Sequence, residues 1–244
     1  MNESRFVRQI PFLSPEGQEK VSATRVGIVG LGGLGSQVAQ ALAFLGTTSF
    51  VLIDDDRIED TNLNRLIGAT PEDAAQSKLK VEVAQRNICG INPSARVRTI
   101  CKNLRSREAL EALTTCPVIF GCVDNDGARL ILMELAAAYN ATLIDSATEI
   151  ILEAGQLLEY GGRVVVARPG DFCLDCAGEI NMVVAKQELE SPETQPLRRA
   201  HGYGLGNEEP AMSVVSLNGI IANLAVTEFM VMIAGIRDPN SYIH

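Results

Sequence analysis

The sequence predicts an α/β fold: a doubly wound, Rossmann-like, mainly parallel sheet with antiparallel strands added at one edge. Two observations predict it. Short apolar runs alternate with amphipathic segments through the first 148 residues, the order expected of parallel strands joined by right-handed crossovers. The first run, RVGIVG at 25–30, enters a glycine-rich turn and an apolar-periodic segment, which outlines a strand, a phosphate-binding loop and a helix.

We expect an N-terminal arm and helix in residues 1–24, because Ser14-Pro15 combines an N-cap with proline at the first helical position. Residues 25–148 follow as the nucleotide-binding half. Its predicted strands are 25–30, 49–54, 96–100, 117–123 and 142–147. Its predicted helices are 34–46, 78–89, 106–113 and 126–139.

The pattern changes in residues 149–244. Residues 151–170 indicate two antiparallel strands around a turn at Gly161-Gly162. Residues 177–210 lack periodicity and predict a long surface connection, of a length that is often functional. The apolar segment 211–235 is long enough to span a membrane, but polar residues spread through it favour a buried core helix.

The composition is typical of one globular domain. The chain has 244 residues, 46% of them hydrophobic and 21% charged, which suits a single domain over 1–244. Its formal net charge of −9 argues against nonspecific binding to nucleic acid or to an anionic membrane. No secretory signal pattern opens the sequence, and its six cysteines are scattered apart from one CxxC, so we expect reduced thiols in a cytoplasm.

The glycine-rich turn predicts a nucleotide site. Gly30, Gly32 and Gly35 fit G-x-G-x-x-G, with Gly33 inside the motif, and Asp54 lies 19 residues after Gly35. Glycines let phosphates approach the backbone, and a carboxylate at the end of the second strand can bond ribose hydroxyls. Taken alone, these residues are typical of a dinucleotide site.

The residues that follow favour ATP over a nicotinamide. Arg65 ends the stretch DDDRIEDTNLNR, Lys78 follows, and Asp124 stands in CVDN at the carboxyl end of a strand. Two cations and a carboxylate suit a triphosphate with Mg²⁺, for which Asp124 is a candidate ligand. The chain leaves little length for the substrate domain that a dehydrogenase needs.

Four motifs in order carry a resemblance: GLGGLGS, the stretch 54–65, Lys78 and VDN at 123–125. With RFVRQ at 5–9 and SVVSLNG near the C-terminus, nearly the whole chain resembles the ubiquitin-activating-enzyme superfamily. Within it, the chain resembles the single-domain bacterial ThiF, MoeB and HesA type. That type includes the sulfur-carrier adenylyltransferases of molybdopterin and thiamine synthesis.

The resemblance implies ATP-dependent adenylation of the C-terminal glycine carboxylate of a ubiquitin-like or sulfur-carrier protein, with release of pyrophosphate. It also implies a homodimer. The implied roles are ribose binding by Asp54 beside Asp56, phosphate contacts by Asn62 and Arg65, charge neutralisation by Lys78, Mg²⁺ binding by Asp124, and contact with the γ-phosphate across the dimer interface by Arg8.

Two departures from the family concern cysteines. Cys173 and Cys176 match the first of two CxxC pairs that hold zinc in the family, but nothing matches the second, and a structural zinc site needs four ligands. Zinc is therefore left open. Residues 177–244 contain no cysteine, so the reaction stops at the adenylate or its nucleophile lies elsewhere. We expect Cys122 to be buried and inert.

Other functions remain open at this point. One is a catalytically inactive, carrier-binding subunit, against which the presence of Arg65, Lys78 and Asp124 argues. Another is an NAD-dependent oxidoreductase. Adenylation of a short peptide is a weaker variant, since only about 24 residues precede the first strand. The residue pattern of the C-terminal third resembles that of activators of bacterial ubiquitin-like conjugation, including those of antiviral defence operons. A conjugating enzyme would then be a further partner.

Overall fold

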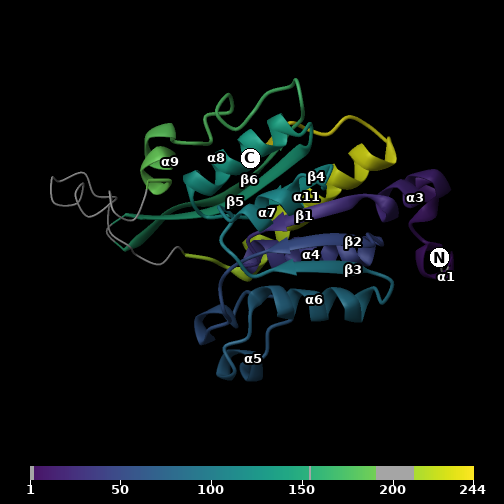
Figure 1. The fold of residues 1–244 in the computed structure, drawn as a ribbon, viewed down its shortest axis with the longest axis horizontal. Coiled ribbons are helices and arrows are strands. Elements are labelled where there is room, and N and C mark those ends of the chain that lie inside the picture. The colour runs from purple at the N-terminus through teal and green to yellow at the C-terminus, as the bar shows by residue number, and fades with distance from the viewer. Residues whose placement is uncertain (1–2, 154, 191–211) are drawn as a thin grey trace.

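The computed structural model describes residues 3–153, 155–190 and 212–244. Their strands form one seven-stranded sheet in the order β3-β2-β1-β4-β5-β6-β7 (Figure 1). The strands are β1 (Arg25–Val29), β2 (Ser49–Ile53), β3 (Arg96–Ile100), β4 (Val118–Gly121), β5 (Thr142–Glu153), β6 (Gln156–Ala167) and β7 (Tyr242–Ile243). The first five strands run parallel. At one edge β6 pairs antiparallel with β5, and β7 pairs antiparallel with β6. The predicted fold class is confirmed.

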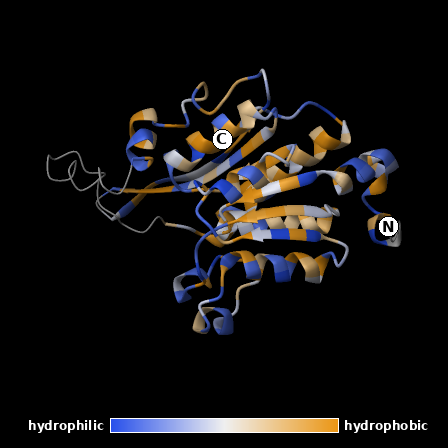
Figure 2. Ribbon diagram, viewed as in Figure 1, coloured by the Kyte–Doolittle hydropathy of each residue, from blue (hydrophilic) through white to orange (hydrophobic). Residues whose placement is uncertain are grey.

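Helices cover both faces of the sheet (Figure 1). They are α1 (Glu3–Phe6), α2 (Ile10–Leu13), α3 (Pro15–Ala23), α4 (Gly33–Leu45), α5 (Pro71–Ala75), α6 (Lys80–Ile91), α7 (Arg107–Leu113), α8 (Asp126–Ala138), α9 (Met182–Glu188) and α11 (Val215–Ala234), with a 3-10 turn η1 (Asp60–Asn62). One core cluster joins the sheet to α4, α6 and α11, and a second joins it to α7, α8 and α9. Figure 2 shows the apolar strands between helices whose outer faces are polar.

Local signals explain the element boundaries. The hydroxyl of Ser14 accepts a 3.0 Å hydrogen bond from the Gly17 N–H, and Pro15 follows, as predicted for the start of α3. Gly46 ends α4 in the left-handed conformation, at φ +101°. Asn125 caps α8 by accepting a 2.8 Å hydrogen bond from the Ala128 N–H. These caps satisfy backbone groups that a helix end leaves unpaired.

The prediction of a turn at Gly161-Gly162 is wrong. β5 runs to Glu153, and β6 begins at Gln156 just after Gly155, which has φ +79°. Both glycines lie inside β6 instead. A Cβ on Gly162 would stand 2.6 Å from the side chain of Ile221, so this glycine allows α11 to pack closely on the strand.

The C-terminal third also contains elements that were not predicted. α9 forms within the connection predicted to be irregular, while residues 191–210 of that connection lie outside the described residues. α11 is long and apolar enough to cross a membrane by composition. It packs on α4, β5 and β6, and buries Asn218 and Glu228, the second of which pairs with Arg237. This packing is that of the predicted core helix.

Candidate active site

A cavity of about 1160 Å³ lies beyond the carboxyl ends of β1, β2 and β4. Its position follows from the strand order, because β1 lies between β2 on one side and β4 on the other. Parallel sheets bind their ligands at such a switch point, where successive crossovers leave the sheet in opposite directions. The loops after these three strands line the cavity, together with the outer half of β5 and residues before α11.

The glycine loop between β1 and α4 is packed too closely for larger residues. Gly30 has φ +84°, and a Cβ there would stand 2.4 Å from the carbonyl oxygen of Cys122. A Cβ on Gly35 would meet the carbonyl oxygen of Gly30 at 1.9 Å, and one on Gly33 would meet Asn218 Nδ2 at 2.3 Å. Gly32 lines the cavity and has open space in front of it. Three glycines therefore shape the loop, and the fourth leaves its backbone accessible.

Asp54 lies at the carboxyl end of β2 and is almost fully buried. Its Oδ2 accepts a 2.6 Å hydrogen bond from the Leu31 N–H, and its Oδ1 accepts a 2.9 Å bond from the Asp56 N–H. Burial raises the pKa of Asp54, an effect that Lys80 and the two N–H groups partly offset. The carboxylate is thus fixed against the glycine loop and lines the cavity.

The structure brings Lys80, and not Lys78, to this cavity. Lys80 begins α6, and its Nζ lies 2.7 Å from Asp56 Oδ2. The Lys78 ammonium lies 3.1 Å from Asp73 Oδ1 and does not line the cavity. The two lysines have the same residue type and differ by two positions, so the direction in which each side chain leaves the chain decides which one faces a ligand.

Arg65 lines the cavity, and its aliphatic stem packs against Gly33. Its guanidinium donates a 2.6 Å hydrogen bond to the Thr61 carbonyl. Asn62 does not line the cavity. Its Oδ1 accepts a 3.1 Å hydrogen bond from the Glu59 N–H, and its carbonyl accepts one from the Arg65 N–H. Asn62 therefore shapes the turn that positions Arg65.

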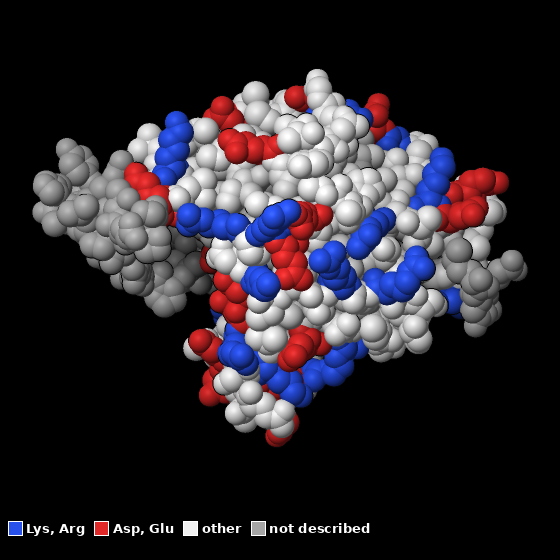
Figure 3. Space-filling model, viewed as in Figure 1, with Lys and Arg blue, Asp and Glu red and all other residues white. Residues whose placement is uncertain are grey.

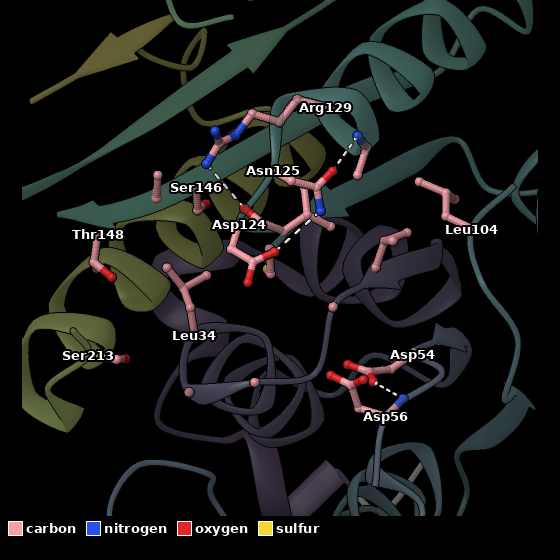
Figure 4. Close-up of a pocket in the computed structure, with 18 of the residues that line it drawn as sticks. Leu34, Asp54, Asp56, Leu104, Asp124, Asn125, Arg129, Ser146, Thr148 and Ser213 are labelled. Atoms are coloured by element: carbon pink, nitrogen blue, oxygen red, sulfur yellow. Dashed lines mark hydrogen bonds between the residues drawn. The ribbon is translucent and has the colours of Figure 1, made fainter. Parts of the chain in front are cut away.

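Asp124 lies across the cavity from Asp54, in the loop after β4 (Figure 4). Asp124 is exposed, and its carboxylate accepts a 3.3 Å hydrogen bond from Asn125 Nδ2. Arg129 on α8 donates a 3.1 Å hydrogen bond to the carbonyl of Val123, the residue before Asp124. This bond ties the loop after β4 to α8. Asp124 thus presents a carboxylate with most of its acceptor capacity free.

Three helices start at the edge of the cavity. They are α4 after Gly32, α8 after Asn125 and α11 after Val214. Each has 13 or more residues. At the starts of α4 and α11 no side chain caps the N–H groups, which together with the helix dipoles favour bound anions. At α8 the N–H groups of Gly127 and Ala128 are already bonded to Glu188 and Asn125. The cavity therefore suits a polyanion even though it also contains carboxylates.

A buried ion network that was not predicted supports the cavity. Asp145 on β5 is fully buried, and its Oδ2 lies 2.6 Å from Arg163 Nη1 and 3.7 Å from Arg129 Nε. Arg163 also pairs with Glu179, which accepts a 2.7 Å hydrogen bond from the Tyr242 hydroxyl. Burial raises the pKa of Asp145, and the two guanidiniums oppose that rise. No local motif marks these residues, because the network joins five separate segments.

Arg8 is exposed at the opposite end of α4 from the glycine loop. Its neighbour Gln9 donates a 3.0 Å hydrogen bond to the carbonyl of Leu45, the last residue of α4. The 13 residues of α4 separate its ends by about 20 Å. Within one chain the structure does not bring Arg8 to the cavity.

Comparison with known proteins agrees with this geometry. The profile of the ThiF family matches residues 5–243, which is nearly the whole chain. The chain belongs to the ThiF family. The resemblance inferred from its motifs is thereby confirmed.

Named relatives of this ThiF-family chain are adenylyltransferases. The sulfur carrier protein ThiS adenylyltransferase of Escherichia coli (strain K12) is 27% identical over 239 residues, covering 96% of this chain and 83% of that protein. The sulfur carrier protein adenylyltransferase of Thermus thermophilus is 32% identical over 164 residues, covering 66% of this chain and 56% of that protein. The chain thus spans little more than half of the second relative.

Solved structures share the fold. A crystal structure of E. coli MccB with ATP has a TM-score of 0.74 and 21% identity, and covers 98% of this chain and 66% of that one. At this level of identity, the likeness extends to the fold alone.

The cysteines of this ThiF-family chain offer no complete zinc site among the described residues. Cys173 and Cys176 lie with their Sγ atoms 3.4 Å apart. The group of three or more possible ligands found within the described ranges is Asp54, Asp55 and Asp56 instead. A structural zinc site has four ligands, so these two cysteines do not form one among the described residues. Cys122 is half-buried and lines the cavity, so the prediction that it is buried is not met, although desolvation of its thiol raises its pKa.

Proposed function

We propose that this member of the ThiF family uses ATP to adenylate the C-terminal glycine carboxylate of a ubiquitin-like or sulfur-carrier protein. The observation that carries the proposal is one cavity lined by the glycine loop and Asp54, by Arg65 and Lys80 among its cations, and by Asp124. The relatives named as sulfur-carrier adenylyltransferases support the same reaction.

The glycine loop and Asp54 provide the nucleotide-binding part. Gly32 leaves backbone N–H groups at the start of α4 open to phosphate, and Asp54 stands at the end of β2, where its carboxylate would accept hydrogen bonds from ribose hydroxyls. Leu104 lines the cavity on the same side as Asp54 and offers an apolar contact to a base (Figure 4), between the polar neighbours Asn103 and Arg105. Asp56 acts by holding Lys80.

Arg65 and Lys80 neutralise the phosphates. We assign to Lys80 the role expected of Lys78, because Lys80 lines the cavity and Lys78 is occupied by Asp73. Asn62 contributes by fixing the turn before Arg65. Asp124 is the residue that would hold Mg²⁺, since that ion takes one or two carboxylates together with phosphate oxygens. When bound there, the ion would add positive charge beside the phosphates.

The chemistry needs charge neutralisation more than proton transfer. The acceptor carboxylate is already ionised near pH 7, so no general base is required. Its oxygen forms a bond to the α-phosphorus, and the bond from that phosphorus to the departing pyrophosphate breaks. Two anions must approach each other for this to happen. Fixed cations and helix N-termini lower that barrier because they are oriented before the reaction begins.

We further propose a homodimer in which Arg8 serves the partner's cavity. α4 contains no charged residue, and the single charged residue of α11, Glu228, is buried. The two helices pack together and expose Phe44 and Ile220, each at 59%. A two-fold axis across this face sets α4 antiparallel to its copy. That arrangement carries Arg8 toward the partner's glycine loop.

The product of this chain is the acyl-adenylate. Cys122 has a raised pKa, and residues 212–244 contain no cysteine. A conjugating enzyme or sulfur donor would then act on the adenylate, as in the bacterial conjugation systems that the C-terminal third resembles. A cytoplasmic location is part of the same proposal.

ATP–pyrophosphate exchange tests the proposal. Purified protein with Mg²⁺ is mixed with labelled pyrophosphate and with each candidate ubiquitin-like or sulfur-carrier protein in turn. We expect exchange that requires the free C-terminus of one carrier and is lost in Asp124→Ala. ATP binding without exchange for any carrier would favour an inactive, carrier-binding subunit. A nicotinamide-dependent absorbance change would revive the oxidoreductase.

A further inference from the structure

Cys173 and Cys176 lie in a short turn that the proposed adenylation does not use. The turn is in the segment that joins β6 to α9 (Figure 1), and neither cysteine lines the cavity. The Ala177 N–H donates a 2.9 Å hydrogen bond to the Cys173 carbonyl. The Glu179 N–H donates a second 2.9 Å bond to the Leu174 carbonyl, and Leu174 is fully buried. The backbone of the turn is therefore fixed, and it holds the two thiols in one arrangement.

The two thiols of this turn face each other. Their Sγ atoms lie 3.4 Å apart. A disulfide bond is about 2.05 Å long, so small rotations of the two side chains are enough to close the pair. Cys176 is exposed and Cys173 is half-buried, so a small molecule can reach the pair from solvent.

The surroundings of the pair do not provide the ligands of a zinc ion. A structural zinc site takes four ligands. Among the residues that the structure describes, no histidine, carboxylate or further cysteine places a ligand atom within 4.8 Å of both thiols. The other cysteines of the chain are Cys89, Cys101, Cys116 and Cys122, which lie on or beside α6, β3 and β4. A pair of thiols without further ligands can react with a disulfide instead.

We propose that Cys173 and Cys176 form a dithiol site that reduces small organic disulfides and is itself oxidised to a disulfide. The Cys173 thiolate forms a bond to one sulfur of the small disulfide, whose S–S bond breaks and releases one small thiolate. Cys176 then loses its proton to solvent, and its sulfur forms a bond to Cys173 Sγ while the second small thiolate leaves. Two protein thiols are oxidised, and one small disulfide is reduced to two thiolates.

The local contacts identify Cys173 as the attacking thiol. The backbone N–H of Cys176 lowers the pKa of Cys173 more than burial raises it. The Cys176 thiol and the Asp175 N–H act in the same direction as that N–H. A thiolate attacks disulfides and a neutral thiol does not, so the stabilised sulfur attacks and the exposed Cys176 completes the exchange.

Charge around the turn selects the class of disulfide. Acidic and basic side chains are interspersed over the face drawn in Figure 3, so the charges next to a site decide what approaches it. Asp175 lies between the two cysteines and is exposed, and its charge opposes formation of the Cys173 thiolate. Asp171 and Asp238 share one cation, Arg168, each at 3.1 Å. Acidic groups thus outnumber basic ones here, so the site favours disulfides without negative charge.

Peptide mass spectrometry tests the dithiol. The full chain is reduced, freed of reductant and treated with 2-hydroxyethyl disulfide, which is neutral, and it is then analysed without further reduction. We expect the peptide that contains both cysteines to lose two hydrogen atoms, to carry no adduct and to release two small thiols. Cys101 is the control, because it is exposed and its Sγ lies 4.0 Å from the Asp55 carbonyl oxygen rather than beside a thiol. Cys101 should keep one adduct.

Single variants and the metal content complete this test. Cys176→Ser should keep a stable adduct on Cys173, and Cys173→Ser should react at Cys176 about tenfold more slowly than the parent pair. Equal rates would overturn the choice of Cys173 as the attacking thiol. Stable adducts on both cysteines of the parent protein would overturn the dithiol site. Zinc retained by the purified protein, with both thiols shielded from the reagent, would overturn it as well.

A ratio of two rates tests the class of disulfide. The rate with 2-hydroxyethyl disulfide is divided by the rate with glutathione disulfide, which is anionic. Because both reagents meet the same thiol, a change in the reactivity of that thiol cancels in the ratio. Asp175→Asn should lower the ratio about threefold, whereas Glu159→Gln, an exposed position in the outer half of β6, should leave it unchanged. An unchanged ratio for Asp175→Asn, or an equal fall for both variants, would overturn the assigned class.

Discussion

The carboxylate of Asp54 accepts a 2.6 Å hydrogen bond from the backbone N–H of Leu31, so the end of β2 fixes the glycine loop that follows β1. A second N–H, that of Asp56, bonds the other oxygen. One side chain therefore links the two segments that are proposed to hold the phosphates and the ribose. Such a link keeps the loop in its binding shape before a ligand arrives.

Asp54→Asn should weaken both the loop and nucleotide binding. An amide side chain has one acceptor oxygen for two N–H groups, and an unpaired buried N–H costs about 1 to 2 kcal/mol of the free energy of unfolding. We expect a lower urea midpoint and a loss of ATP affinity of about tenfold, equivalent to about 1.4 kcal/mol. Calorimetric titration with ATP and urea unfolding measure the two effects. Unchanged ATP affinity would contradict ribose binding by Asp54.

The same variant should alter the pH dependence of stability. Because the pKa of Asp54 is raised in the folded state, the folded protein holds this proton more tightly than the unfolded chain. Its contribution to the free energy of unfolding is therefore largest below the ordinary Asp pKa of about 3.9 and decreases as pH rises through the raised pKa. Asp54→Asn should lack this decrease. Urea titrations between pH 4 and 7 compare the two slopes.

The sheet and the glycine loop could be predicted because their signals are local. Apolar runs mark buried strands, and the glycine spacing marks a turn whose backbone approaches other groups. Gly161-Gly162 carries the same local signal for a different reason, since Gly162 makes room for Ile221 of α11. That reason depends on a helix about 60 residues away, which a pattern of neighbours cannot reveal.

The site was predicted in its residue types more than in its exact positions. Lys78 and Lys80 differ in the direction in which their side chains point. Lys78 pairs with the buried carboxylate of Asp73, whereas Lys80 pairs with Asp56. Asp145 and Arg163 were missed because their partners come from distant segments. Asn218 belongs to SVVSLNG, which was noted as a motif, but its contact with Gly33 appears only in the fold.

Lys80→Ala and Lys78→Ala should separate catalysis from stability. Removing one preorganised cation should lower the rate of carrier-dependent exchange about 100-fold, or about 3 kcal/mol of barrier, for Lys80→Ala. Lys78→Ala removes a partly exposed ion pair with Asp73 and should cost less than about 1 kcal/mol of stability, with exchange nearly unchanged. Exchange rates and urea midpoints are measured on both proteins. The reverse ranking would restore Lys78 to the site.

Asp73 should stabilise the protein in a pH-dependent way. The Arg86 guanidinium, aided by Thr70 and Lys78, holds the pKa of Asp73 well below its usual range despite burial. A lowered folded-state pKa gives a contribution that is present above the ordinary Asp pKa of about 3.9 and is lost as pH falls below it. Asp73→Asn should cost about 2 kcal/mol of the free energy of unfolding near pH 7. The difference from the parent protein should shrink below pH 4, and a constant difference would exclude this ion pair as its cause.

Gly32→Ala should block nucleotide binding without harming the fold. Gly32 has φ −71° and open space before it, so a methyl group fits the free protein but projects where phosphates must approach the backbone. ATP affinity should fall about tenfold or more, equivalent to about 1.4 kcal/mol. Gly90→Ala is the control: Gly90 lies inside α6 with nothing near its Cβ position, and alanine there should stabilise by about 1 kcal/mol. Normal ATP binding by Gly32→Ala would place the phosphates elsewhere.

Mixing two inactive variants should test whether Arg8 acts across a dimer. If Arg8 serves the partner's cavity while Asp124 serves its own, a mixed dimer of Arg8→Ala and Asp124→Ala has one cavity with both defects and one with neither. Random pairing of equal amounts should then recover about a quarter of the parent exchange activity. Each variant alone should be inactive, because its two cavities carry the same defect. Arg8→Ala mixed with itself is the control for the handling of the samples, and sedimentation verifies that dimers form and exchange.

Recovery depends on the distance of about 20 Å between the two ends of α4, which keeps Arg8 away from the glycine loop of its own chain. No recovery in a verified mixed dimer would mean that Arg8 and Asp124 serve the same cavity, or that Arg8 serves none.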